Sequence, residues 1–578
     1  MSSFVKMNGC RPCSASGSVL AFLLVALAVF PASIRADTND FMWVRTSGGS
    51  GAEVSHQIAV DNAGSSYIVG YFNSTNFSIG GIVLTNYSPS VVNPWDVFVA
   101  KYDTDGNVLW ATKFGGTNND RGWGIAVDTN RNCYVTGFFN STNFFIGGVT
   151  LTNFSPNGNN SLFIAKLDAS GNVLWAHGPD AGYNSSGYQV AADNAGNCYV
   201  TGSFYGTNTF GGIRLVSRGS SDAFLLKYDP SGSLLWAQQG GGTAIDGGIA
   251  VALDPTGDPY LLADIRSTNA AFGGFVLSVM GTNTCQDFVV AKYDPAGNVI
   301  WAKVFGGTSV DSATGIAVDK SSNCYITGDT SSSNVYFGSI VLSNAYNLLP
   351  DTALFIAKLS PSGNPVWAVA GQGDNNNVGS TGIAIDPFGN AYITGFFLSA
   401  TLAFGSTTFP LSGMTLTNTE PNFISGGPAD IFVARFDPYG QLMRTVQVTG
   451  TNDQRAFSIA VDSRANPYIT GWTQGTNVLF GSIAVTNAYL DLFVAKLDPD
   501  YPVLQTRLDT SLNNPDLLFV YWPVNKTGGA VPTLESSTNF TDWGPADNIF
   551  GFAVGGGQYG FIVIASADFR FYRLRFDP

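Results

Sequence analysis

Histidine and positive charge are scarce in this chain. Its 578 residues include 2 histidines, and 27 lysines and arginines stand against 41 aspartates and glutamates, for a net charge of −14. Binding of nucleic-acid phosphates needs clustered positive charge, so this balance excludes a nucleic-acid partner. Glutamate occurs only as Glu53, Glu420 and Glu535. The negative charge is therefore aspartate, most of it at turn positions.

Cysteine is also rare, with 6 in the chain. Cys133, Cys198 and Cys324 occupy the same position in three copies of a repeated segment. Equivalent positions of separate copies lie farther apart than the roughly 7 Å between Cα atoms that a disulfide allows. We therefore expect buried free thiols, and no spacing of cysteine and histidine indicates zinc.

Long apolar runs are absent after the first 36 residues. Val19–Phe30 is the one such run before that point, and Lys6 and Arg11 precede it. This pattern is typical of a secretory signal peptide, with cleavage near Ala36, and the run is too short for an easy membrane span. The sequence predicts a signal peptide over residues 1–36, a secreted or cell-surface protein, and no membrane span after cleavage.

The chain contains one segment that recurs along its length, with some residues changed in each copy. Phe98–Gly137 reads FVAKYDTDGNVLWATKFGGTNNDRGWGIAVDTNRNCYVTG. Four short apolar runs rich in Val, Ile, Phe, Tyr and Trp alternate with turns rich in Asp, Asn and Gly, which predicts four strands joined by hairpins. Runs such as Phe98–Ala100 are apolar without alternation, so we expect strands that are covered on both faces.

The segment can be counted along the chain. The FVAKYD run begins seven times, at Phe98, Phe163, Phe224, Val289, Phe355, Phe432 and Phe493. The run that carries tryptophan contains Trp43, Trp110, Trp175, Trp236, Trp301 and Trp367, with Met443 in the remaining place. The period of about 60–75 residues exceeds the ~40–50 of common propeller repeats, and the excess falls in loops.

These observations predict an all-β fold, a seven-bladed β-propeller over residues 37–500. The repeats begin with a lone fourth strand, Phe41–Thr46, and end with the first three strands, Ile459–Leu497. One blade would thus combine three C-terminal strands with one N-terminal strand. Such closure removes the exposed sheet edges.

The repeated residues resemble the bacterial seven-bladed β-propeller repeat family over about residues 41–500. The resemblance implies a secreted or surface propeller and no shared catalytic residues. Residues 504–578 lose the repeat, and runs such as Leu517–Pro523 predict strands. The stretches TLESSTNFTDW and FYRLRF resemble a small C-terminal β-module of secreted proteins from Verrucomicrobia-like bacteria, which implies a β-sandwich-like appendage.

One face of the propeller is the expected binding face. The turns after the first and third strands are tight, whereas the loops after the second and fourth strands are long. The loops after the second strands include motifs such as Phe210–Ile213, which predict small extra hairpins. Binding residues concentrate in loops on a rigid scaffold. Aromatic residues on this face that the other repeats lack are the candidate ligand contacts: Trp95, Trp123, Tyr183, Tyr188 and Trp472.

Residues repeated in every copy are interpreted as structural, because a single binding or reaction centre is asymmetric. A lysine such as Lys101 recurs in the third strand and is expected to pair with an aspartate of its own unit. Aspartate turns such as Asp103–Gly106 resemble calcium loops, but an aspartate that bonds its own turn explains them more simply.

Acidic residues in the loops before the first strands are the candidate metal ligands, with calcium as the metal such oxygen ligands take. The alternative is that they brace the loops. The candidates are Asp120, Asp246, Asp311 and Asp453. No other cofactor is indicated.

Three functions fit the sequence. The first is a secreted, non-enzymatic binding or interaction propeller that recognises a glycan or protein on the long-loop face. The second is an enzyme. A polysaccharide hydrolase or lyase would need two aspartates about 5–10 Å apart, and Leu167–Ala176 resembles a quinoprotein tryptophan-docking repeat. The third is a structural surface protein. No catalytic constellation favours the second, since His56 beside Glu53 lacks a nucleophile.

Overall fold

The computed structural model describes residues 40–88, 94–155, 158–281, 285–343, 352–373, 378–405, 415–418 and 428–499, and strands between residues 505 and 575. Every regular element in these ranges is a β-strand, as the sequence predicts. Within them, no helix is long and apolar enough to cross a membrane. The predicted signal peptide, residues 1–36, lies outside the described residues.

Residues 41–498 form four-stranded antiparallel units, numbered here in chain order, with strands a to d. Unit 1 consists of β2 (Glu53–Val60), β3 (Ser66–Phe72), β6 (Asp96–Tyr102) and β7 (Val108–Phe114). Unit 2 consists of β8 (Asp120–Val127), β9 (Cys133–Phe139), β12 (Ser161–Leu167) and β13 (Val173–His177). Unit 3 consists of β15 (Ser185–Ala192), β16 (Cys198–Phe204), β19 (Asp222–Tyr228) and β20 (Leu234–Gly241). Unit 4 consists of β21 (Asp246–Leu253), β22 (Pro259–Ile265), β25 (Asp287–Tyr293) and β26 (Val299–Phe305).

The later units follow the same strand order. Unit 5 consists of β27 (Asp311–Val318), β28 (Cys324–Thr330), β31 (Ala353–Leu359) and β32 (Pro365–Gly373). Unit 6 consists of β33 (Val378–Ile385), β34 (Ala391–Phe397), β37 (Asp430–Phe436) and β38 (Leu442–Thr449). Unit 7 consists of β39 (Gln454–Val461), β40 (Pro467–Phe480), β41 (Ile483–Leu497) and β1 (Phe41–Ser47).

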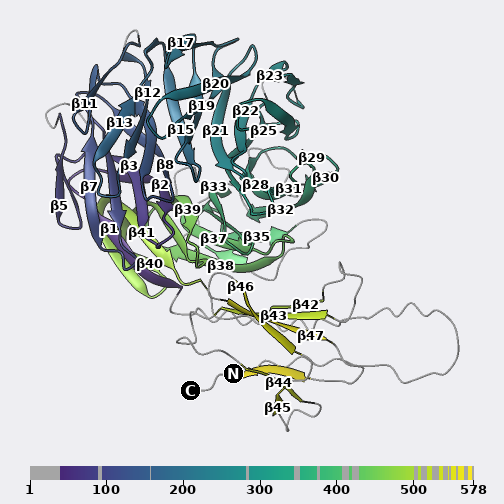
Figure 1. The fold of residues 1–578 in the computed structure, drawn as a ribbon. Helices are drawn as coiled ribbons and strands as arrows, with labels where there is room; N and C mark the ends of the chain where they lie inside the picture. The colour runs from purple at the N-terminus through teal and green to yellow at the C-terminus, as the bar shows by residue number, and fades with distance from the viewer. Residues whose placement is uncertain are drawn as a thin grey trace. The chain divides into compact units, whose positions relative to one another are not determined.

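Unit 7 joins the two ends of this part of the chain. Strand β1 pairs antiparallel with β41, with Trp43 opposite Lys496 and Thr46 opposite Phe493 (Figure 1). The predicted pairing of the N-terminal strand with the last three strands is therefore observed. Because β1 occupies the free edge of β41, the main chain of this edge strand is hydrogen-bonded rather than exposed.

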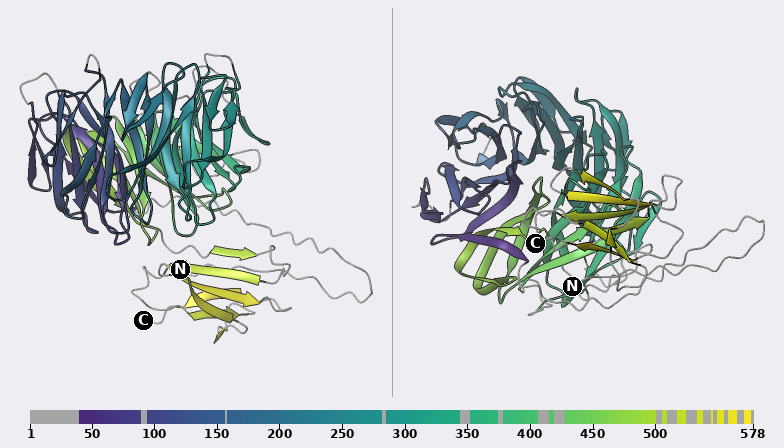
Figure 2. Two further views of the ribbon diagram at one scale, coloured as in Figure 1. Left: turned by 45° about the horizontal axis from the view of Figure 1, so that its top comes forward. Right: turned by 60° about the horizontal axis from the view of Figure 1, so that its bottom comes forward.

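The units stand around a ring (Figures 1 and 2). Strand a of each unit contacts strand a of the next, in the order β2, β8, β15, β21, β27, β33 and β39, and β39 contacts β2. Strands b and c are buried along almost their whole length, as in β6, where every residue is buried. Apolar cores lie between neighbouring units. One such core stacks Phe288 of unit 4 on Phe355 of unit 5, with the ring centroids 5.2 Å apart.

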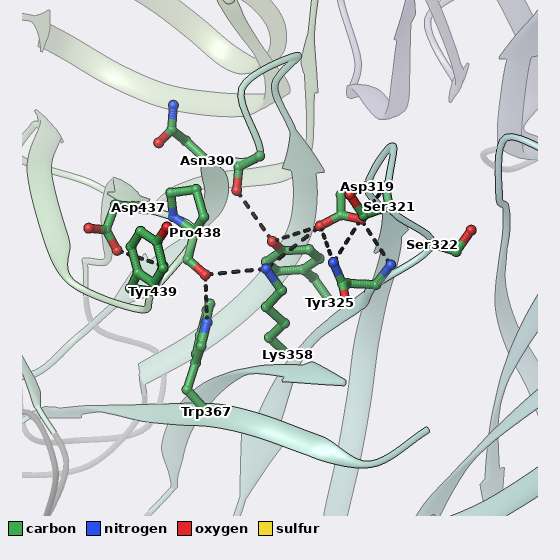
Figure 3. Close-up of polar contacts among 12 residues, drawn as sticks. Asp319, Ser321, Ser322, Tyr325, Lys358, Trp367, Asn390, Asp437, Pro438 and Tyr439 are labelled. Atoms are coloured by element: carbon green, nitrogen blue, oxygen red, sulfur yellow. Dashed lines mark hydrogen bonds and ion pairs between the residues drawn. The ribbon is translucent and has the colours of Figure 1, made fainter. Parts of the chain in front are cut away.

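A polar contact set near the tight turns ties each unit to the next (Figure 3). In unit 5, Lys358 lies 4.8 Å from the ring centroid of Tyr325 and 3.6 Å from a carboxylate oxygen of Asp319. Its Nζ donates to the carbonyl oxygen of Pro438 in unit 6, and the indole N–H of Trp367 donates to the same oxygen at 3.0 Å. The repeated lysine and tryptophan therefore serve the junction between units.

The same contacts recur around the ring. A tryptophan of strand d donates to the turn between strands c and d of the following unit in the pairs Trp43–Thr104, Trp110–Ala169, Trp175–Pro230, Trp236–Pro295 and Trp301–Pro361. Every lysine of the series lies over a tyrosine ring, as Lys101 does over Tyr67. The expected aspartate partner is present for Lys292, which contacts Asp254 at 2.9 Å.

Unit 6 departs from this pattern, and the assignment of Met443 to the tryptophan position is wrong. Arg444 lies opposite Arg435, in the register that pairs Trp367 with Lys358 in unit 5. Unit 7 has no continuous turn between its strands c and d, because the chain ends meet there. Arg444 instead donates to the carbonyl oxygen of Asp498 at 3.1 Å and pairs with Asp40 at 2.7 Å, and so contacts both chain ends.

The loop between strands b and c forms the predicted extra hairpin in each unit, and these hairpins are part of the scaffold. The hairpins are β4 (Asn76–Ile79) with β5 (Ile82–Thr85), β10 (Asn143–Ile146) with β11 (Val149–Thr152), β17 (Thr207–Phe210) with β18 (Ile213–Val216), β23 (Ala270–Phe272) with β24 (Phe275–Leu277), β29 (Asn334–Phe337) with β30 (Ile340–Ser343), β35 (Thr401–Gly405) with β36 (Thr415–Thr417), and the outer parts of β40 and β41.

Each hairpin docks at or just after the end of strand d of the preceding unit, and in unit 3 it pairs with β14 (Ala181–Gly182), a short strand that follows β13. In unit 4, Phe272 pairs with Gly240 at the end of β20, and in unit 2, Phe145 bridges to Gly115 just after β7. Gly115 also lies against the carboxylate of Asp96, where a Cβ atom would clash. The glycine pair that ends strand d therefore gives the room that this close approach requires.

The C-terminal part, from Pro499 onward, is a separate compact part of the chain. One sheet has the order β42 (Gln505–Leu508), β43 (Leu517–Pro523), β47 (Gln558–Ile564) and β46 (Ile549–Val554). The other has the order β45 (Gly544–Pro545), β44 (Thr533–Ser537) and β48 (Phe571–Arg575). The predicted strand at Leu517–Pro523 is present.

The contacts of Arg444 lead to a test of closure. We expect Arg444→Ala to lower the free energy of unfolding by about 1 kcal/mol, since it removes a charge-assisted hydrogen bond that is about a quarter exposed. Hydrogen exchange followed by mass spectrometry should show faster exchange of the amides of β1 than in the native protein.

The control is Arg131→Ala, which breaks an exposed 3.8 Å pair with Asp61. It should leave exchange in β1 unchanged. Equal exchange of β1 in the native protein and in Arg444→Ala would contradict the role of Arg444 in holding the chain ends.

Candidate binding face

The two ends of the units differ because adjacent strands run antiparallel. The connections between strands a and b and between strands c and d share one end of each unit, and they are tight aspartate turns such as Asp128–Asn132. The connections between b and c and between d and a share the other end, which we call the long-loop face. The asymmetric residues described next lie on strand a and near this face.

Each strand a contains one β-bulge at an equivalent position. The register with strand b skips one residue in every unit, and the skipped residues are His56, Trp123, Tyr188, Ile249, Thr314, Thr381 and Phe457. A bulge re-aims a side chain and is common next to functional sites. Because successive strands a contact one another around the ring, these residues form a circuit on the innermost strands.

Four of the bulge residues form an aromatic arc. His56 stacks on Phe457 with the ring centroids 5.6 Å apart and on Trp123 at 5.8 Å. Trp123 contacts Tyr188 at 4.8 Å. Burial lowers the pKa of His56 to about 4, so the imidazole is neutral at pH 7. The arc therefore spans units 7, 1, 2 and 3 with uncharged, half-buried rings.

The other half of the circuit is small and hydroxyl-bearing. Thr381 donates to the carbonyl oxygen of Ala456 at 2.8 Å, and Thr314 shares a 3.4 Å contact with the hydroxyl of Ser380. Units 4 to 6 thus present Ile249 and two threonines where units 7 to 3 present rings. This difference between units is the kind of asymmetry that a single ligand requires.

Two aspartates lie beside the hydroxyl half, at one position of strand b. The residues at this position are Tyr71, Phe138, Ser203, Asp264, Asp329, Phe396 and Trp472. Burial raises the pKa of Asp264 to about 7, and burial raises the pKa of Asp329 to the same value. Carboxyl groups with such pKa values near a face are candidates for function.

Ser312 connects the two aspartates. Its hydroxyl donates to Asp264 at 2.7 Å, and it lies directly opposite Asp329 in the pairing of β27 with β28. Directly opposed residues have Cβ atoms about 4.5–5.5 Å apart. Asp264 also accepts from Gln286 at 2.7 Å, while its Oδ1 is buried without a hydrogen-bond partner. Both carboxyl groups therefore flank one serine.

Two arginines lie beside the aromatic half, at one position of strand a. Arg121 in unit 2 lies over Tyr71, 4.9 Å from the ring centroid, and over Trp95 at 5.6 Å. Arg455 in unit 7 lies over Phe396 at 4.6 Å. Each is stacked on rings at the end of strand a that leads to the long-loop face.

The structure brings some of the predicted aromatic residues together. Trp123 and Tyr188 are in contact within the aromatic arc, and Trp95 meets Tyr71 at 5.0 Å under Arg121. Trp472 lies 6.0 Å from the guanidinium of Arg455. Tyr183 contacts only the ring of Tyr205 among the described aromatic residues, at 6.5 Å, and is separate from the arc.

The candidate metal ligands are placed apart from one another. Asp120 accepts from Ser141, Asp246 from Ser267 and Asp311 from Ser332, each within its own unit. Asp453 pairs with Arg455 at 3.2 Å. Among the described residues, no group of three or more His, Cys, Asp or Glu side chains is placed to hold a metal ion. These contacts are those expected of carboxylates that brace loops.

Sequence reasoning missed Arg121, Asp264 and Asp329. Asp264 and Asp329 are charged residues inside predicted strands, and Arg121 lies in the loop expected before strand a. At each of these two positions, five of the seven repeats have uncharged residues. The comparison that singled out unrepeated aromatic residues would have found them if it had included unrepeated charges. The bulges, by contrast, leave no clear signal, because the inner strands read as continuous runs.

The family comparison agrees with this architecture. A family model described as a beta-propeller repeat matches residues 300–335, which cover strand d of unit 4 and strands a and b of unit 5. This segment is similar to the beta-propeller repeat, and the ring of repeated four-stranded units has the architecture of a β-propeller.

Two relatives are similar to this chain at low identity or over a short stretch. The propeller is 25% identical over 455 residues to an uncharacterised WD repeat-containing protein of Acanthamoeba polyphaga mimivirus, covering 66% of this chain and 32% of that protein. It is 30% identical over 115 residues to the regulatory protein FlaEY of Caulobacter vibrioides, covering 20% of this chain and 12% of that protein. The chain thus spans a third or less of the length of these relatives.

The chain is also similar to solved structures, at low identity and low TM-score. BamB from Moraxella catarrhalis is 12% identical, with a TM-score of 0.32, over 72% of this chain and 93% of that chain. A propeller fold is compatible with binding and interaction roles, and no ligand follows from it.

The raised carboxyl pKa values predict a pH dependence of stability. Burial raises the pKa of Glu53, Asp96, Asp264 and Asp329 to about 7, against unfolded values of about 4. Between these values the folded state binds more protons, so stability falls as the pH rises from about 4 to about 7. Thermal unfolding from pH 4.5 to 7.5 should show a falling midpoint.

Asp264→Asn provides the check on this assignment, because it removes one of the contributing groups. It should make the slope of the unfolding midpoint against pH shallower, whereas Asp105→Asn, at an exposed turn position, should not. A midpoint that rises across this range would contradict the pKa assignment.

Proposed function

We propose that this chain is a secreted, closed seven-bladed β-propeller that binds a glycan on its long-loop face. The number of strand-a contacts around the ring and the pairing of β1 with β41 support seven blades. The apolar run before Ala36 supports secretion. The strands after Gln505 support a small β-sandwich-like appendage.

The aromatic arc carries the proposal for a glycan. Trp123 and Tyr188 contact each other at equivalent bulges of adjacent units, and units 4 to 6 have no aromatic ring at this position. Half-buried rings offer an apolar surface for the faces of sugar rings. The carboxyl groups of Asp264 and Asp329, which flank Ser312, offer oxygens to sugar hydroxyls on the units that follow.

The arc is tested by a glycan array and by calorimetry with the best-bound polysaccharide. We expect Trp123→Ala to weaken binding by about tenfold or more, since a buried aromatic contact contributes about 1–3 kcal/mol. Tyr183→Ala is the matched control, because Tyr183 is exposed on the same part of the molecule but lies outside the arc. Equal losses in both variants, or no glycan bound by the native protein, would contradict the proposal.

A glycan hydrolase is the second candidate, and Asp264 with Asp329 favours it. Glycosidases need two carboxyl groups, one of which is protonated near neutral pH. The pair flanks Ser312, and burial raises the pKa of both carboxyl groups to about 7.

The hydrolase is tested by release of reducing ends from the bound polysaccharide. Asp264→Asn and Asp329→Asn should each abolish release while leaving binding detectable. Absence of release by the native protein from a polysaccharide that it binds would rule this second function out.

A further inference from the structure

Arg121 differs from Arg455, the other arginine at its position of strand a, in what its guanidinium leaves unbonded. Within the part of the chain that the structure describes, the guanidinium of Arg121 makes no ion pair or hydrogen bond, although it lies over Tyr71 and Trp95. Its Nε is buried without an acceptor. Arginine carries five N–H donors and no acceptor, so these donors are available only to a molecule from outside.

The equivalent residue of unit 7 shows what a paired arginine looks like here. Arg455 occupies the same position of strand a and also lies over rings, but it donates to Asp453 at 3.2 Å. The other units have Val54, Ser186, Gly247, Ser312 and Gly379 at this position. At this position of strand a, the described residues therefore include one unpaired arginine, which lies next to the aromatic arc.

The other N–H groups of the Arg121 guanidinium can donate to a ligand oxygen. A carboxylate fits the guanidinium best, because the planar groups pair through two parallel hydrogen bonds. His56 is neutral at pH 7 and shares the same neighbourhood, so Arg121 is the cation that such a group would meet.

Resting on the proposed glycan function, we infer that the ligand is an acidic glycan whose uronate carboxylate pairs with Arg121. The sugar ring that carries the carboxylate stacks near Trp95. The neighbouring sugar reaches Trp123, which lies two residues after Arg121 in β8. The chain has a net charge of −14, so long-range attraction does not favour such a ligand. Selection for the acidic sugar therefore comes from the short-range pair.

The test uses polygalacturonate and alginate, each beside its carboxyl-reduced neutral polymer, with the full mature chain in a calorimeter at fixed salt. The native protein should bind at least one uronate polymer about tenfold or more tightly than its reduced form. Arg121→Met should remove this preference, and Arg455→Met should keep it. Because Arg121 has no polar partner in the protein, Arg121→Met should match or exceed the native urea midpoint.

The outcomes separate this inference from the function on which it rests. If neutral and acidic polymers bind equally, or if Arg121→Met keeps the preference, the inference is wrong and the glycan function stands. If Arg455→Met removes the preference instead, the inference is also wrong. If no polysaccharide binds, neutral or acidic, in this panel or on the array, the proposed function fails together with the inference.

Discussion

Each four-stranded unit between residues 41 and 498 is apolar on both faces, and contact with two neighbouring units is what removes both faces from water. The burial of Phe288 against Phe355 shows one such junction. No sheet can meet this requirement alone, and a row of sheets would leave two faces wet. The ring of strand-a contacts and the shared unit at the chain ends both follow from this one constraint.

Residues that are repeated in every unit and residues that differ between units have different roles. The residues present in every unit, such as Lys358 with Tyr325 and Trp367, hold one unit to the next. The residues that vary lie at a few equivalent positions on strands a and b, where the scaffold tolerates different side chains. Arg121 in unit 2 and Asp264 in unit 4 are such variants, and they lie beside rings in one case and beside hydroxyls in the other.

Much of the fold could be predicted from the sequence, because turn chemistry and apolar runs are local properties. The pairing of the strand of Trp43 with that of Phe493 followed from counting repeats. The tryptophan position of unit 6 was assigned to Met443 instead of Arg444, because only the observed register shows which side chain faces the neighbouring turn. The candidate site was only partly predictable. Trp123 and Tyr188 were identified as unrepeated, but their contact depends on bulges that sequence patterns do not reveal.

The docking of each hairpin on the preceding unit has a consequence for how such a chain can change in length. A duplicated stretch that runs from one strand a to the next strand d contains a hairpin that covers strand d of the preceding unit. It also contains a new strand d, which the hairpin of the following unit covers. Whole repeats are thus self-sufficient modules for gene duplication. A deletion that removes only a hairpin would instead expose the edge of strand d in the preceding unit, although the sequence of that unit is unchanged.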